Sequence, residues 1–130
     1  MSTSIPAQIA PGELIDKITI LEIKLERMSD AAKLANVRHE WEVLTASRDI
    51  HTEPSEALST LSDQLKQINE ALWDIEDNIR DCEREGDFGP TFIELARAVY
   101  RTNDVRAQLK RDINVLLGSD LVEEKSYKAY

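Results

Sequence analysis

Apolar side chains recur every three or four residues along most of the chain, a spacing that predicts amphipathic helices. The first stripe follows Pro11-Gly12 and comprises Leu14, Ile18, Leu21, Leu25 and Met28. The next is two positions out of phase with it and comprises Leu34, Val37, Trp41 and Leu44. One straight helix cannot turn both stripes to one neighbour, so we predict helices at about 12–29 and 31–46. Either Ser29 or Asp30 would cap the second helix, and the polar segment 45–55 with Pro54 predicts a loop.

The longest regular pattern predicts a third helix at about 54–85, ending at Gly86. Its apolar stripe alternates steps of three and four, as in a coiled coil: Leu58, Leu61, Leu65, Ile68, Leu72, Ile75, Ile79 and Cys82. Thirty helical residues span about 45 Å, whereas a compact chain of this length has a radius of gyration of about 14 Å. We therefore expect an elongated molecule.

A fourth helix is predicted at 90–117, because Pro90 suits a first helical position and Gly118 suits a helix end. The tail at 119–130 is short and mixed in charge. Its apolar residues can dock on the bundle: Leu121, Val122, Tyr127 and Tyr130. Together the pattern predicts a single domain over residues 1–130, an all-α, elongated antiparallel bundle of about four helices built on one long central helix.

The composition fits one acidic globular domain of 130 residues with a formal net charge of −9. Residues 51–89 hold three basic and eleven acidic side chains, while residues 90–130 are mildly basic. These two segments would attract one another if packed side by side.

The acidity argues against nucleic acid and anionic membranes as partners. The longest apolar run is too short for a membrane span or a signal peptide, and the one cysteine fits a reducing cytoplasm.

Several strings resemble a family of small bacterial proteins classed as a domain of unknown function. The longest is Pro11-Gly-Glu-Leu-Ile-Asp-Lys-Ile-Thr-Ile-Leu-Glu-Ile-Lys24. Shorter ones lie at 32–38, 71–76, 86–90, 99–104 and 123–127, so the resemblance covers nearly the whole chain. It implies a bacterial, soluble and mostly helical protein with no established activity, and it carries no catalytic residue with it.

A ligand pocket is best sought near Arg106, which with Thr102 interrupts the apolar stripe of the fourth helix. A guanidinium in that stripe needs a carboxylate or water, since an unpaired buried charge is costly. Candidate partners are Glu13, Asp16, Glu40 and Glu76, and the pocket candidates also include Lys17 and Asn103. The functional interpretation is a polar pocket for an anionic ligand. The structural interpretation, which we favour, is an ion pair that fixes helix register, or a helix that kinks and turns Arg106 outward.

An acidic face on the third helix offers a weak metal site. Asp74, Asp77 and Asp81 follow Glu70 at helical spacing, and with Glu13 and Asp16 they resemble the paired carboxylates of all-α nucleotide pyrophosphohydrolases that bind Mg²⁺. These residues fall on the side away from the apolar stripe, and such faces are usually just solvated. We therefore predict neither a metal nor another cofactor.

The first helix is apolar around most of its circumference, because Ile15, Ile20 and Ile23 lie outside its main stripe. Such a helix is buried on more than one side. Either the tail, another helix or a second subunit covers it, and the length of the third helix favours a dimer. Ile20, Ile23 and Trp73 are the interface candidates.

No stronger chemical motif is present. His39 and His51 lack the spacing of a di-iron site, and Cys82 lies on an apolar stripe as a core residue would. The sequence favours a non-catalytic, cytoplasmic interaction or accessory protein, a homodimer or the partner of another protein. The alternative is a small enzyme or anionic-ligand-binding bundle near Arg106, similar to helical mutases or Mg²⁺-dependent pyrophosphohydrolases.

Overall fold

The computed structural model describes residues 3–130, which fold into four α-helices without a strand. Helix α1 spans Pro11–Arg27, α2 Ala31–His51, α3 Glu56–Glu85 and α4 Pro90–Leu116. The chain is thus an all-α bundle with one helix of 30 residues, as the sequence predicts. None of these helices combines the length and the apolar character that crossing a membrane requires.

The helix ends follow from local chemistry. The side chains of Asp30 and Ser55 accept hydrogen bonds from the third backbone N–H beyond them, at 3.0 Å in both cases, and so cap α2 and α3. Gly86 ends α3 with φ at 70°, a conformation that an L side chain rarely adopts. Pro90 begins α4, where its missing N–H costs no helical hydrogen bond.

The predicted loop at 45–55 is wrong over most of its length, because α2 continues to His51. The segment is polar since α2 packs only against α1, so most of its circumference faces water. The helix ends where Pro54 disfavours helical geometry at the preceding residue. Only residues 52–55 connect α2 to α3.

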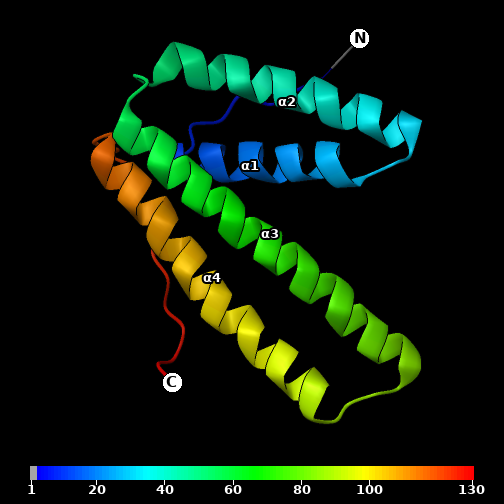
Figure 1. Cartoon of the computed structure of the whole chain (residues 1–130). Coiled ribbons are helices and arrows are strands. Elements are labelled where there is room, and N and C mark those ends of the chain that lie inside the picture. Colours follow the sequence, from blue (N-terminus) through cyan, green and yellow to red (C-terminus); the bar gives the residue numbers. More distant parts are fainter. Residues whose placement is uncertain (1–2) are drawn as a thin grey trace.

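The helices form a V (Figure 1). Helices α1 and α2 lie antiparallel in one arm, and α3 and α4 form a longer antiparallel hairpin that diverges from α1. We call α1 with residues 56–71 and 100–116 the closed end, and residues 72–99 the open hairpin. The described core lies in the closed end, where Ile15, Leu58, Leu65 and Ile113 contact one another.

Ion pairs connect α1 to α3 and to α4. Among the described residues, every ion pair between two helices has one partner on α1, including Arg27 with Asp74 at 2.5 Å and Lys66 with Glu26. Helices α3 and α4 do pack side by side, as their opposite charge suggested, but no described ion pair joins them. In the closed end they meet through the apolar residues Leu58, Leu65 and Ile113.

Candidate functional site

A buried carboxylate occupies the centre of the closed end. Asp16 on α1 is 1% exposed and accepts hydrogen bonds from Arg106 Nε at 3.0 Å and Nη2 at 2.5 Å. Asn69 Nδ2 on α3 donates to Asp16 Oδ1 and to Thr19 Oγ1, both at 2.9 Å. Three helices therefore meet at one carboxylate, and no described buried side-chain polar atom is left without a partner.

Arg106 on α4 donates to both carboxylate oxygens of Asp16, which is the bidentate geometry that Arg–carboxylate pairs favour. The hydrogen bonds to Asp16 raise the pKa of the guanidinium above its ordinary value, against the opposing effect of burial. Its side chain is 29% exposed, because its outer edge borders the opening of the V. The arrangement therefore combines an internal ion pair with a guanidinium edge that solvent reaches.

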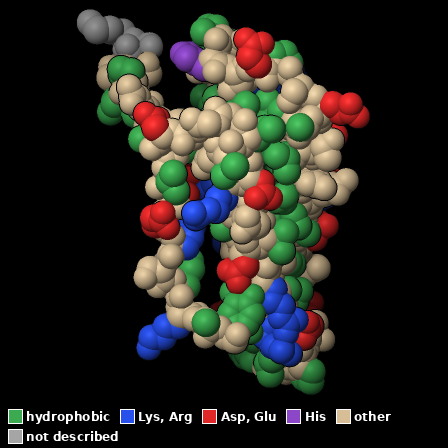
Figure 2. Space-filling model, turned by 90° about the vertical axis from the view of Figure 1, so that its left-hand side faces the viewer, with side chains coloured by type: hydrophobic (Ala, Val, Ile, Leu, Met, Phe, Trp, Pro, Cys, Tyr) green, Lys and Arg blue, Asp and Glu red, His purple; other side chains and the backbone are tan. Residues whose placement is uncertain are grey.

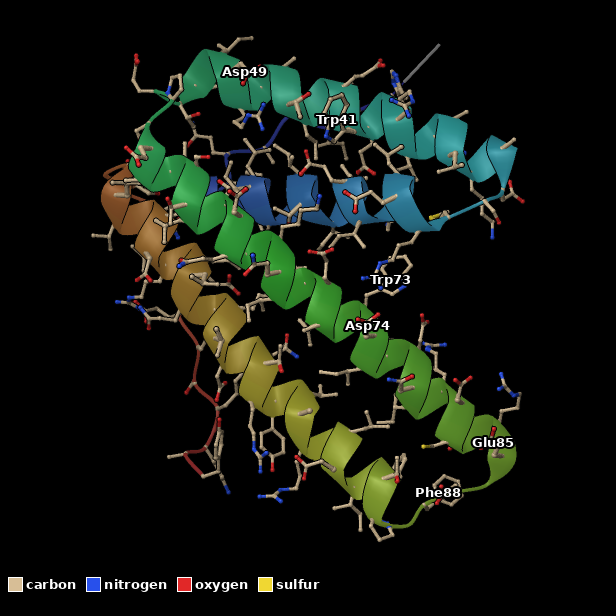
Figure 3. The ribbon with its side chains drawn as sticks, in the orientation of Figure 1. Trp41, Asp49, Trp73, Asp74, Glu85 and Phe88 are labelled. Atoms are coloured by element: carbon tan, nitrogen blue, oxygen red, sulfur yellow. The ribbon has the colours of Figure 1, made fainter. Side chains whose placement is uncertain are left out.

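That outer edge lines a groove of about 460 Å³ between α1, α3 and α4. Helix α1 contributes Ile20 and Ile23, and Leu72, Trp73 and Val99 add further apolar wall. The polar lining residues are Asn69, Glu76, Asp77, Arg80, Asn103 and Arg106. Trp73 projects into the angle between α1 and α3 (Figure 3), with the guanidinium of Arg27 6.0 Å from its ring centroid. We call this feature the V groove.

The pocket candidates from the sequence do not form one site. Arg106 and Asn103 line the V groove, and Asp16 is buried behind Arg106, whereas Thr102 is half-buried and does not line the groove. Glu13 instead pairs with Lys110 at 2.7 Å at the opposite edge of the closed end. Lys17 is exposed and lies 3.7 Å from Glu13 on its own helix.

The edge near Glu13 is a tight crossing of α1 and α4. The Gly12 N–H donates to Asn114 Oδ1 at 2.7 Å, which supplies the cap that Ala10 cannot. A β-carbon on Gly12 would lie 2.3 Å from the Lys110 carbonyl oxygen, so only glycine fits. Lys110 is 12% exposed between Glu13 and Glu123 of the tail. The crossing of α1 and α4 lies on the left-hand side of Figure 1, which faces the viewer in Figure 2. On that face, Lys and Arg side chains lie between separate acidic ones.

The acidic residues of α3 are dispersed. Asp74 contacts Arg27, Asp81 lies 2.9 Å from Arg84, and Asp77 lines the V groove. The metal hypothesis required them to face Glu13 and Asp16, but those residues are engaged by Lys110 and Arg106. Within residues 3–130, no three His, Cys, Asp or Glu side chains lie together as a metal site requires.

The interface candidates differ in exposure. Ile23 is 1% exposed, so the chain's own helices already cover it, whereas Ile20 and Trp73 are half-buried in the V groove. Cys82 is buried, and burial raises the pKa of its thiol, which therefore stays protonated and unreactive at neutral pH.

Sequence reasoning missed four residues of these two clusters. Thr19 and Asn69 each follow an apolar stripe residue by one position, where a polar side chain normally marks the edge of the buried face. Asn114 follows Ile113 in the same way, whereas Gly12 gave no signal, because only the crossing of α1 over α4 makes the two neighbours. An exposed-looking polar residue at a stripe edge is the one sign that was present.

Residues 5–130 match the model of a family described as Family of unknown function (DUF6165), so the chain belongs to that family. No curated protein and no solved structure matches the chain significantly.

Proposed function

We propose that this family member is a non-catalytic helical interaction protein of the bacterial cytoplasm, which acts as a homodimer through apolar helix surfaces. The observation that carries the proposal is the saturation of Asp16. Its oxygens receive three hydrogen bonds from Arg106 and Asn69, and it is almost inaccessible to a substrate. A general acid or base must reach the reacting group, so this carboxylate suits a structural role.

The exposed apolar surface supports the same proposal. Among the described residues, ten apolar side chains are buried and fourteen large ones are exposed. Only Phe88 and Ile93 of the exposed ones lie in the open hairpin, whose stripe residues are mostly half-buried. Single exposed apolar residues are ordinary, but a small core beside a long half-exposed hairpin is typical of a chain that completes its core by association. The acidity of residues 51–89 keeps nucleic acid outside the expected partners.

The second candidate is an anionic-ligand-binding bundle, favoured by the position of Arg106 and Asn103 on the V groove. Two features weigh against it. The charge of Arg106 is already balanced by Asp16, and Glu76 and Asp77 line the same groove. An anion would meet a surface whose charges largely cancel.

A thermal-shift screen separates the two candidates. The full chain is heated with Mg²⁺, Mn²⁺, nucleotides and dicarboxylates, and we expect no rise in melting temperature from any of them. Asn103→Ala tests the groove, and Gln67→Ala on the exposed side of α3 is its matched control. A ligand that stabilises the wild type and the control but not Asn103→Ala would overturn the interaction proposal in favour of the ligand-binding bundle.

Co-purification of the tagged chain from its own cells gives the positive readout. We expect Val99→Glu on the V groove to remove associated polypeptides, and the paired replacement Asp16→Leu with Arg106→Met to retain them. Loss of association in the paired replacement alone, with folding intact by circular dichroism, would contradict a structural role for the ion pair.

A further inference from the structure

The open hairpin carries an apolar stripe that its own chain covers only on one side. Of the ten buried apolar residues, Cys82 is the only one within residues 72–99. The other stripe residues there are half-buried: Leu72, Ile75, Ile79, Phe92, Leu95 and Val99. Two helices alone leave a stripe open to water along its length, and a further helix is needed to enclose it, as α1 does for Leu65 in the closed end.

The exposed area has the size that a dimer needs. The chain exposes 9167 Å², whereas a compact monomer of 14.8 kDa exposes about 7,000 Å². The excess is about 2,000 Å², and a stable interface takes about 800 Å² from each partner.

Of the three charged residues on the groove side of α3, Glu76 and Arg80 can form a self-complementary pair, and Asp77 lies beside them. Glu76 and Arg80 lie one turn apart on that side, are 55% and 75% exposed, and contact each other at 2.9 Å. In a contact with two-fold symmetry, if one residue of the first copy meets a second residue of the other copy, the reverse contact also forms. Two α3 helices that cross antiparallel between these positions place Glu76 of each copy beside Arg80 of the other.

We propose that two copies of this chain pair through their open hairpins, each hairpin lying in the V groove of the other. The contact forms an antiparallel four-helix bundle with Leu72, Trp73 and Val99 at its centre and the Glu76–Arg80 pairs at its sides. This pairing rests on the proposed interaction function, because it assigns the surface through which the homodimer forms. A single chain leaves the V groove open, and in the dimer the hairpin of the second chain fills it.

A charge-reversal experiment tests the pairing. Glu76→Arg and Arg80→Glu each place like charges across the two-fold axis, so each variant is expected to weaken the dimer about tenfold or more. A mixture of the two variants restores opposite charges at both contacts and is expected to form a heterodimer. Sedimentation velocity over a range of concentrations measures the dissociation constants, and native mass spectrometry identifies the heterodimer.

Arg48→Glu on α2 is the matched control, because Arg48 pairs with neighbouring Asp49 outside the hairpin; its dissociation constant is expected to equal that of the wild type. Trp73 gives an independent signal, since dimerisation buries its ring; in a Trp41→Phe chain its emission is expected to shift to shorter wavelength as concentration rises.

Three results would overturn the pairing: a wild-type monomer at a hundred micromolar, a dimer that neither single variant weakens, or weakened variants that fail to pair when mixed. None of these alters the thermal-shift screen. A monomer that binds no small ligand and retains its co-purifying polypeptides through Val99 would end the dimer proposal and leave the interaction function standing.

Discussion

The closed end and the open hairpin are built on the same apolar stripe of α3, yet they pack differently. In the closed end, Leu65 is fully buried beneath α1 and α4. Two turns further along, Leu72 lines the V groove and is only half-buried. The sequence pattern is unchanged between these positions. What changes is the number of helices around α3, because α1 ends at Arg27 while α3 and α4 continue (Figure 1).

The difference shows that a regular apolar stripe predicts which face of a helix is covered, but not what covers it. In the closed end the cover is α1, which also supplies the polar contacts that fix its position: Asp16 to Arg106, and Glu13 to Lys110. The open hairpin has no such polar anchor between its two helices. We expect stability to be unequally distributed along α3, with hydrogen exchange slower in the closed end than in the hairpin.

Truncation of matched stripe residues tests this inequality most directly. Leu65→Ala leaves a cavity in a fully buried site and is expected to lower the free energy of unfolding by about 3 kcal/mol. Ile79→Ala removes a half-buried side chain and is expected to cost about 1 kcal/mol. Urea unfolding followed by circular dichroism at low protein concentration gives both values. Equal losses would mean that the hairpin is as well packed as the closed end.

The polar anchor of the closed end is tested by removing one partner and then both. Asp16→Ala leaves Arg106 without its acceptor and Asn69 with Thr19 alone, and is expected to cost about 3 kcal/mol. The pair Asp16→Leu with Arg106→Met is expected to recover most of that loss, because an apolar replacement of a buried ion pair is often neutral. Chemical denaturation of all three chains measures the coupling. A double variant as unstable as Asp16→Ala would show that the ion pair itself stabilises the fold.

The α1–α4 crossing shows how little free space the closed end has. Gly12→Ala would place its methyl group against the Lys110 backbone and crowd Asn114, so α1 must move. We expect a loss of about 2 kcal/mol, measured as a fall in melting temperature by calorimetry. Gly89→Ala is the control, since its nearest neighbour is the flexible Asp87 side chain at 3.3 Å. A Gly12→Ala chain as stable as the control would show that the crossing is not tight.

The sequence predicted the four helices and two members of the polar cluster, Arg106 and its candidate partner Asp16. The stripe of α3 and its end at Gly86 were readable, because periodicity and glycine chemistry are local. The interruption at Arg106 showed that a carboxylate was needed, and Asp16 was among the candidates. The continuation of α2 to His51 was not readable from polarity, which reports exposure rather than helix ends. The V could not be predicted either, since the angle between α1 and α3 depends on contacts distant in sequence.

The smallest expected effect concerns the tail, which lies against α4 through Glu123 with Lys110 at 3.4 Å and through Tyr130 with Asp104 at 2.6 Å. The hydrogen bond from Lys125, with the charge of Lys110, lowers the pKa of Glu123 below its ordinary value. The hydrogen bond from Lys125 forms within the tail, so only the attraction to Lys110 links the ionisation of Glu123 to docking. That contribution is present above the ordinary pKa, about 4.3, and is lost as the pH falls through the lowered pKa. Hydrogen exchange of residues 119–130 is therefore expected to show weaker protection in acid once the rates are corrected for the intrinsic pH dependence of exchange.

Glu123→Gln is expected to weaken this protection already at neutral pH and to flatten its pH dependence. Because the Glu123 side chain is 48% exposed, the melting temperature of the helices is expected to stay unchanged in that variant.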